Sequence, residues 1–298
     1  MHIVWLGRPE CADAARVGGK AANLSRLAAR HPVPPGFCLP AATFAEWFAH
    51  PSTAAAGASP AEPLSDTLPD SLRAALCEAY AELGRLVGRP APQVAVRSSA
   101  VDEDGSLASF AGQHESYLNI TGAEALCAAV ARCFASARSE RALAYRRQQG
   151  LEPQAQLAVL VQELVPADVA AVAFSADPVA GRRDQVMINA AWGLGESIVG
   201  GTVTPDTYWV DKTTLAPADV RIAAKTRMHV PGPNGTREVP VPRLLQEQPA
   251  LSEAQCAQLA RLTCALEAEM GWPVDIEAAF AGEALYLLQC RPITRIGR

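Results

Sequence analysis

The sequence predicts an α+β protein in which helices flank mixed and antiparallel sheets. Short apolar runs with polar or Gly-rich boundaries, such as residues 93–99 and 157–165, are typical of strands. Longer stretches with apolar residues every three or four positions, such as 71–87, are typical of helices. A Gly-containing break between two apolar-rich runs in residues 273–292 indicates a β-hairpin at the end of the sequence.

Size and composition set limits on the possible functions. At 298 residues and 49% hydrophobic content, the chain can bury a full core. The net charge of −5 argues against nucleic-acid binding, which favours a basic surface. No apolar run approaches the roughly 18 residues of a membrane span. The eight cysteines form no Cys-x-x-Cys pair, so we expect reduced core thiols in a cytoplasmic protein.

The first half of the chain predicts alternating short strands and helices. Gly18-Gly19-Lys20 opens a helical pattern that ends at the Pro-rich segment 31–36. Residues 51–70 have no periodicity and are interpreted as a loop, as is the Gly/Ser-rich segment 102–112. The expected strands are 3–6, 93–99 and 115–120, and the further helices are 41–50, 71–87 and 122–150.

The second half is richer in strands. The expected strands are 157–165, 170–175 and 185–190, with edge strands at 207–211 and 220–224. Residues 193–201 are Gly-rich, and the Pro-rich segment 231–250 is interpreted as a connector. Ser252 is a good N-cap for a helix over 252–270, which leads into the final hairpin.

Alternation along this hairpin predicts which side chains share a face. A three-residue loop at 281–283 pairs Phe280 with Ala284 and Asp275 with Gln289, and it collects the apolar residues on one side. The expected apolar face holds Ile276, Ala278, Phe280, Tyr286, Leu288 and Cys290. The opposite face then holds Asp275, Glu277, Gln289 and Arg291.

The polar face has the chemistry of a metal and phosphate site. Carboxylate and amide oxygens suit Mg²⁺, which completes its shell with phosphates and water. Arg291 is placed to neutralise the same phosphates. The hairpin alone also fits a solvated strand face with an Asp–Arg ion pair, so this alternative stays open at the level of one motif.

Other segments carry weaker signals of the same kind. Lys20 places a cation at a helix start, which is a natural phosphate site, although a surface Lys is commoner there. Arg97 ends an apolar strand, and an ordinary surface Arg is the alternative. The Gly/Ser segment 105–113 could cover phosphates with its amides or could be a plain loop.

Together these motifs resemble a known family, and the match covers nearly the whole chain. The sequence is similar to the N-terminal ATP-binding domain of phosphoenolpyruvate synthase, pyruvate phosphate dikinase and rifampin phosphotransferase. The motifs that carry the resemblance occur in this order: Gly-Gly-Lys-x-x-Asn-Leu (18–24), Pro-Val-Pro-Pro-Gly-Phe (32–37), Val-Ala-Val-Arg-Ser-Ser-Ala (94–100), Ala-Ser-Phe-Ala-Gly-Gln (108–113), Phe-Ser-Ala-Asp-Pro-Val-x-Gly-Arg-Arg-Asp (174–184), Trp-Gly-Leu-Gly-Glu (192–196), Thr-Pro-Asp (204–206), Asp-Ile-Glu (275–277) and Leu-Gln-Cys-Arg-Pro (288–292).

The resemblance implies an ATP-grasp fold over residues 1–298, with ATP between an N-terminal lobe (1–160) and a C-terminal lobe (161–298). It implies that ATP and Mg²⁺ are the cofactors. The implied phosphate-contacting cations are Lys20, Arg97 and Arg291, and the implied phosphate-covering loop contributes Ser109, Gly112 and Gln113. The implied adenine and ribose contacts are Gln162, Glu163, Val165 and Asp168, and the implied metal ligands are Glu277 and Gln289 with Asp275 in support.

One departure from the family pattern concerns the phosphate acceptor. Family enzymes carry a phosphohistidine domain, and none of the five histidines here lies in a Thr-Gly-Gly-x-x-Ser-His segment. We therefore expect a phosphotransferase module whose acceptor is a small molecule or a separate phosphohistidine-domain protein, with no nucleic-acid or membrane partner. The alternatives are a silent ATP-binding regulatory subunit, an ATP-grasp ligase that acts through an acyl phosphate, or a truncated piece of a longer enzyme.

Overall fold

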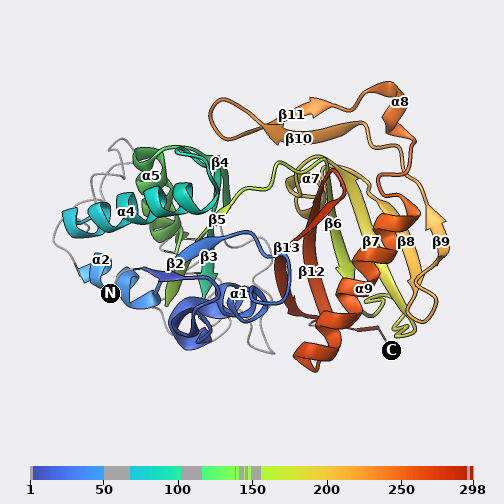
Figure 1. The fold of residues 1–298 in the computed structure, drawn as a ribbon, viewed down its shortest axis with the longest axis horizontal. Coiled ribbons are helices and arrows are strands. Elements are labelled where there is room, and N and C mark those ends of the chain that lie inside the picture. The colour runs from blue at the N-terminus through green and yellow to red at the C-terminus, as the bar shows by residue number, and fades with distance from the viewer. Residues whose placement is uncertain are drawn as a thin grey trace. The chain divides into compact units, whose positions relative to one another are not determined.

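The structure is a computed structural model, and it describes residues 3–49, 68–101, 116–137, 139–140, 144, 147–148, 156–293 and 296–297 (Figure 1). Most of the two expected loops, at 51–70 and 102–112, lies outside these residues. The chain divides into two compact units, each described by itself below. The first comprises Met1–Arg30 and Pro34–Leu164, and the second comprises His31–Val33 and Val165–Arg298.

The first unit is built on a five-stranded sheet in which neighbouring strands are antiparallel. Its strands, in spatial order, are β1 (Val4–Trp5), β2 (Gly36–Leu39), β5 (Leu157–Glu163), β3 (Val94–Ala100) and β4 (Ser116–Ile120). Strand β2 was not predicted from the sequence. It has only four residues between two prolines, and all four are buried, so it shows no alternation of apolar and polar side chains.

Helices cover both faces of this sheet. They are α1 (Ala14–Leu27), α2 (Ala41–Ala49), α4 (Asp70–Leu86) and α5 (Ala123–Ser136), with a short 3₁₀ turn η1 at Pro9–Cys11. Side chains of β3 and β5 such as Val96 and Val159 pack with α2, α4 and α5 in one large core. Because side chains alternate along a strand, Arg97 and Ser99 lie on the other face, where α1 packs.

The second unit is built on a six-stranded antiparallel sheet. In spatial order its strands are β13 (Ala284–Pro292), β12 (Val274–Ala281), β6 (Val169–Phe174), β7 (Gln185–Trp192), β8 (Asp206–Asp211) and β9 (Pro217–Arg221). Strand β8 is therefore internal rather than the expected edge strand, because β9 pairs with its outer side. The short α7 (Glu196–Val199) interrupts the Gly-rich segment after β7.

Helix α9 (Glu253–Met270) crosses one face of this sheet (Figure 1). Ser252 Oγ accepts a hydrogen bond from Gln255 N, and Ser252 N donates to Gln255 Oε1, so the predicted N-cap is present as a full capping box. Tyr208 of β8 meets the start of α9 through a hydrogen bond from Leu251 N to its hydroxyl. Along each strand, the side chains adjacent to Tyr208 and its cross-strand partners point to the other side of the sheet, away from α9. We call this side the face opposite α9.

The segment 231–250 is folded, contrary to the prediction of a Pro-rich connector. Strands β10 (Arg227–Pro231) and β11 (Thr236–Pro240) form an antiparallel hairpin, and α8 (Arg243–Gln246) follows (Figure 1). Pro231 and Pro240 end the two strands and Pro242 is the N-cap of α8, and these are positions where proline is tolerated. These prolines therefore mark the ends of the elements and do not interrupt them.

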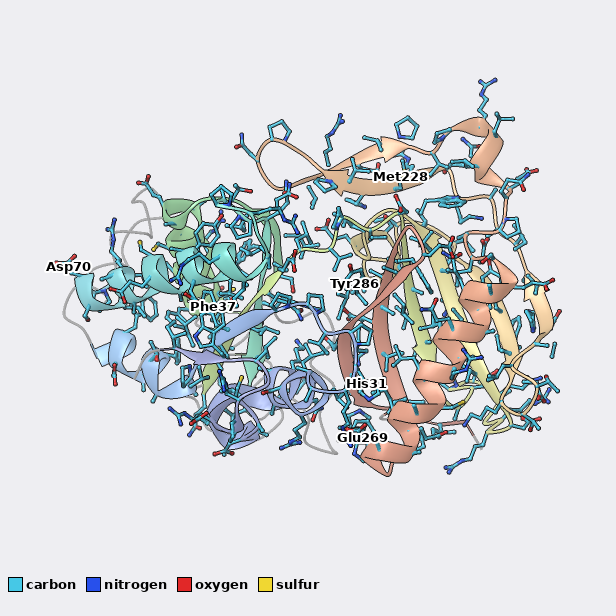
Figure 2. All side chains as sticks on the ribbon, in the orientation of Figure 1. His31, Phe37, Asp70, Met228, Glu269 and Tyr286 are labelled. Carbon is cyan, nitrogen blue, oxygen red and sulfur yellow. The ribbon has the colours of Figure 1, made fainter. Side chains whose placement is uncertain are left out.

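The segment His31–Val33 belongs to the second unit although it lies between α1 and β2 in the sequence. Leu287 N of β13 donates to Pro32 O at 2.9 Å. His31 Nε2 lies 3.0 Å from Glu269 Oε2 near the end of α9, where Figure 2 shows the two side chains together. All eight cysteines are free thiols, as expected, and six are buried. Within the described residues, no helix combines the length and apolar character that crossing a bilayer requires.

Candidate functional site

The register of the β12–β13 hairpin differs from the predicted one. Ala281 pairs with Ala284, so the turn has two residues instead of three. A β-bulge at Leu288 then shifts the pairing by one residue between Ala278 and Glu277. The predicted pairs Phe280–Ala284 and Asp275–Gln289 are wrong, and Glu277 instead pairs with Gln289.

The bulge determines which side chains share a face. Tyr286 pairs with Ala279 and so lies on the face of Glu277, not on the predicted apolar face. Leu288 is the extra residue of the bulge. Beyond it, the alternation of faces along β13 is reversed, so that Gln289 and Arg291 lie on the same face as Tyr286. The paired residues Glu277–Gln289 and Asp275–Arg291 therefore share one face despite the changed loop, as the sequence led us to expect.

Asp275 and Arg291 form a tight ion pair on this face. Arg291 donates through Nε and Nη2 to Asp275 Oδ2, with both nitrogens 2.8 Å from that oxygen. Burial raises the pKa of Asp275, and the Arg291 guanidinium opposes this shift. Since one carboxylate oxygen is held by the guanidinium, Asp275 is suited to orient Arg291 and support the neighbouring pair.

Glu277 and Gln289 form the adjacent cross-strand pair. Directly opposite residues in a sheet have Cβ atoms about 5 Å apart, so both side chains can reach one small ion. Glu277 is half-buried, and Gln289 is 3% exposed. One carboxylate and one amide oxygen, with a second carboxylate behind them, fit Mg²⁺, which binds through few protein ligands and takes the rest from phosphates and water.

Among the residues that the structure describes, no group of three or more His, Cys, Asp or Glu side chains is arranged to hold a metal ion. A zinc or transition-metal cage is therefore not formed by those residues. The oxygen-donor pair on the hairpin remains the candidate for a hard cation.

In the first unit, Gly18 brings α1 against the end of β3. Its backbone is non-helical, with φ of 74°, and divides α1 into two parts. A Cβ at this position would lie 2.4 Å from both Ser99 O and Ser99 Oγ, so only glycine allows this approach. Ser99 Oγ then accepts a hydrogen bond from Ala21 N at 3.3 Å and satisfies a donor at the restarted helix. Sequence reasoning missed this role of Ser99, although the Ser98-Ser99 pair was visible.

Lys20 of α1 contacts β3 at the residue that follows Arg97. Lys20 Nζ donates to Ser98 O at 3.4 Å, which directs its ammonium group to the chain position next to Arg97. Arg97 is paired with Leu160 across the sheet, and two residues along the strand Ala95 is paired with Gln162. Arg97 and Gln162 therefore share the sheet face on which α1 packs, and Gln162 Nε2 donates to Pro34 O at 3.1 Å.

Glu163 points to the other face of the same sheet and forms an ion pair with Arg89. Burial raises the pKa of Glu163, while the charge of Arg89 acts in the opposite direction. Val165, just beyond β5, accepts a hydrogen bond from Ala167 N through its carbonyl oxygen. The expected adenine and ribose roles of Glu163 and Val165 remain predictions.

Asp168 braces the tip of the β12–β13 hairpin. Its Oδ2 accepts from Gly282 N at 2.7 Å, and its backbone N donates to Phe280 O at 2.9 Å. Its carbonyl oxygen accepts a hydrogen bond from Gly193 N at 2.8 Å, so Asp168 also contacts the Gly-rich segment after β7. The expected phosphate-covering residues Ser109, Gly112 and Gln113 lie outside the described residues.

Comparison with known proteins gives one family. The model of the pyruvate phosphate dikinase AMP/ATP-binding domain matches residues 62–298. The chain is 38% identical over 317 aligned residues to a probable phosphoenolpyruvate synthase of Methanocaldococcus jannaschii, an alignment that covers 99% of this chain. It is 40% identical over 231 residues to a rifampicin phosphotransferase of Streptomyces sviceus, covering 77% of this chain. It is also 36% identical over 300 residues, or 98% of the chain, to a prodigiosin synthesizing transferase of Serratia marcescens.

These relatives are much longer than the chain. The matched region is 27% of the Methanocaldococcus protein, 26% of the Streptomyces protein and 33% of the Serratia protein. The similarity therefore concerns one part of each relative.

Proposed function

Because this chain belongs to the family of pyruvate phosphate dikinase AMP/ATP-binding domains, we propose that it is an ATP- and Mg²⁺-dependent phosphotransferase module. It transfers a phosphoryl or pyrophosphoryl group from ATP to an acceptor that lies outside these 298 residues. The observation that carries this proposal is the pairing of Glu277 with Gln289 beside Asp275 with Arg291, on one sheet face.

In this proposal Mg²⁺ is held by Glu277 and Gln289, with Asp275 in support. The ion supplies charge neutralisation and orientation of the phosphate oxygens. The protein's own part is to fix the two ligands in adjacent strands and to orient Arg291 through the ion pair with Asp275. This rigid placement matters because phosphoryl transfer depends mainly on positioning and charge.

The remaining phosphate contacts come from the first unit. Lys20 lies on α1, which packs against β3, and Arg97 lies on β3; both cations are proposed to bind the triphosphate. The phosphate-covering residues are proposed to be Ser109, Gly112 and Gln113. Gln162, Glu163 and Val165 are proposed to line the adenine, with Glu163 or Asp168 at the ribose.

The bond that breaks defines the product. Attack of an acceptor on the β-phosphorus breaks its bond to the oxygen shared with the α-phosphate, and AMP leaves with that oxygen. The acceptor then carries the β,γ-pyrophosphoryl group, from which water releases the γ-phosphate and leaves a phosphoryl group on the acceptor. Attack on the γ-phosphorus releases ADP instead. We propose the AMP-forming route because it is the one that the family resemblance implies. The acceptor is proposed to be a separate histidine-bearing domain or a small molecule, because none of the five histidines lies in a Thr-Gly-Gly-x-x-Ser-His segment.

A direct test uses imidazole as a soluble substitute for a histidine acceptor. The protein is incubated with ATP and Mg²⁺, with and without imidazole, and AMP, ADP, phosphate and pyrophosphate are separated and quantified. ³¹P NMR identifies any phosphorylated imidazole. Two controls are included: omission of Mg²⁺ is expected to abolish product formation, and Glu277→Gln is expected to lower it strongly.

The outcomes separate the alternatives. AMP together with a phosphorylated acceptor supports the proposal. Tight ATP binding without turnover, also in the presence of a histidine-bearing partner domain, supports a regulatory subunit and contradicts the transferase. ADP formation with a hydroxylamine-trapped acyl group supports an ATP-grasp ligase.

A further inference from the structure

The row of side chains that contains Glu277 continues across the second unit's sheet. Glu277 pairs with Val172, Val172 pairs with Asn189, and Asn189 pairs with Thr207. Directly paired residues point to the same side, so all four lie on the face opposite α9. Each of these side chains is half-buried, whereas their neighbours Ile188 and Tyr208, which face α9, are buried.

The amide of Asn189 is held in one orientation. Thr207 Oγ1 donates to Asn189 Oδ1 at 3.0 Å. Oδ1 is engaged by this hydroxyl, and the Nδ2 group of the same amide carries two N–H donors. Asparagine has a low intrinsic propensity for strands. The presence of Asn189 in β7 is therefore better explained by a polar contact of its side chain than by a preference for strand structure.

The spacing fits a group that bridges Glu277 and Asn189. Neighbouring strands are about 4.8 Å apart, so two steps place the backbones of Glu277 and Asn189 about 10 Å apart. Val172 between them is short and apolar, and it does not compete for a ligand. A Mg²⁺ ion lies about 2.1 Å from its oxygen ligands, and an N–H donor lies about 2.9 Å from its acceptor. A phosphate group between the ion and the amide spans the remaining gap.

We propose that Asn189 is a further phosphate-binding residue, whose Nδ2 donates to a β- or γ-phosphate oxygen of the metal-bound nucleotide. Thr207 acts as a positioning residue, because it contacts the amide and not the nucleotide. This inference rests on the proposed function, since it requires that Glu277 binds the metal of an ATP complex. It adds a neutral donor to the set of cations and metal ligands described above.

The test compares nucleotides that differ in their phosphates. Equilibrium binding of Mg·ATP and of AMP is measured by calorimetry for the parent protein and for Asn189→Asp, Asn189→Ser, Thr207→Val and Thr207→Ser. Loss of a hydrogen bond to a charged group corresponds to roughly tenfold weaker binding, which is the expectation for Asn189→Ser with Mg·ATP. Asn189→Asp places a carboxylate near phosphates and is expected to weaken Mg·ATP binding by more than Asn189→Ser. AMP binding stays within about twofold of the parent in each case, because AMP lacks the two outer phosphates.

Thr207 has a distinct signature. Thr207→Val removes the hydroxyl at nearly constant shape and is expected to weaken Mg·ATP binding about threefold, while Thr207→Ser restores it. The double variant Asn189→Ser/Thr207→Val should bind no more weakly than Asn189→Ser, because Thr207 acts through Asn189. Gln248→Glu, which adds a negative charge at an exposed position, is the charge-matched control for Asn189→Asp and should leave Mg·ATP binding unchanged.

The results separate this inference from the proposed function. If the parent protein binds Mg·ATP and the Asn189 variants bind it equally well, Asn189 has only a structural role and the inference fails alone. If the affinities for Mg·ATP and for AMP decrease by the same factor in the Asn189 variants, the side chain supports the fold and does not contact the outer phosphates. If the parent protein does not bind Mg·ATP, both the inference and the proposed function are overturned.

Discussion

Among the residues of the site, Asp275 shows how burial and charge oppose one another. Burial raises its pKa. At pH values between its ordinary pKa and the raised pKa, the carboxyl group is protonated in the folded state and ionised in the unfolded state. Stability therefore falls as the pH rises through that interval. Arg291 limits the loss by pairing with the carboxylate.

Replacement of Arg291 by Ala should enlarge this effect. The pKa of Asp275 rises further without its cation, so the interval of falling stability extends upward. We expect a loss of about 1–3 kcal/mol in the free energy of unfolding at pH 7.5, the range for leaving a buried polar group without its partner. The loss should be smaller at pH 5. Urea denaturation at both pH values measures it.

The control for this experiment is Arg291→Ala combined with Asp275→Asn, which removes the titrating group. The difference between the two pH values should disappear in the double variant. An equal loss for Arg291→Ala at pH 5 and pH 7.5 would show that packing of the Arg side chain, rather than the charge of Asp275, dominates.

Glu277 provides the second prediction at the scale of single residues. Glu277→Gln keeps the shape and removes the charge that favours Mg²⁺, so we expect a loss of at least about 100-fold in ATP turnover at a fixed Mg²⁺ concentration. The loss should shrink as Mg²⁺ is raised if the variant mainly weakens metal binding. Glu283→Gln, on the exposed turn of the same hairpin, is the matched control and should turn over normally.

At the scale of elements, the terminal hairpin shows what alternation can and cannot predict. The sequence correctly placed Asp275, Glu277, Gln289 and Arg291 on one face. It could not locate the bulge at Leu288, because a bulge inserts one residue without a distinctive composition. The assumed three-residue loop gave the same face for these four residues but the wrong partners and the wrong side for Tyr286.

Other elements were missed for reasons of length and context. Strand β2 is too short and too fully buried to show a period. The hairpin of β10 and β11 was hidden by prolines, which lie at element ends where they are tolerated. The contact of Gly18 with Ser99 joins residues far apart in the sequence, so no local pattern could predict it.

Helix α1 provides a test of whether Gly18 has a steric role beyond its backbone conformation. Gly18→Ala combines positive φ with a clash against Ser99, whereas Gly271→Ala has nearly the same φ of 75° and open space around its Cβ. The strain alone costs about 1–2 kcal/mol. We expect a clearly larger loss of unfolding free energy for Gly18→Ala, together with weaker ATP binding because Lys20 is displaced. Equal losses for the two variants would mean that the α1–β3 contact adapts without cost.

The turn of the terminal hairpin tests two roles for Asp168. If Asp168 only braces Gly282, Asp168→Ala should lower stability by about 1 kcal/mol and weaken binding of ATP and of 2′- and 3′-deoxy-ATP by the same factor. If it also contacts the ribose, the parent protein should prefer ATP over one of the deoxynucleotides, and the variant should lose this preference. Calorimetric titration with the three nucleotides decides between the two roles.

At the scale of the whole molecule, the proposed ligands come from two compact units that the chain connects through residues 30–34 and 164–165. Lys20 and Arg97 belong to the first unit, and Glu277, Gln289 and Arg291 belong to the second. Only the family resemblance relates these segments to one nucleotide. The geometry within each unit shows why each set of side chains converges locally, but the local patterns of the sequence do not link the two sets.

Coupling between the units can be measured directly. If one Mg·ATP is bound by residues of both units, Arg97→Gln and Glu277→Gln each weaken binding, by about 10- to 100-fold for loss of a charged contact. The double variant should then be weaker than the parent by less than the product of the two factors, with a coupling energy of about 0.5–3 kcal/mol, because either loss already releases part of the same triphosphate. Arg85→Gln, on an exposed part of α4 where the partner is Glu82 one turn earlier, is the control and should show no coupling. Unchanged Mg·ATP binding in either single variant would indicate that the two units do not share one nucleotide, and the assignment of a common triphosphate to both would have to be abandoned.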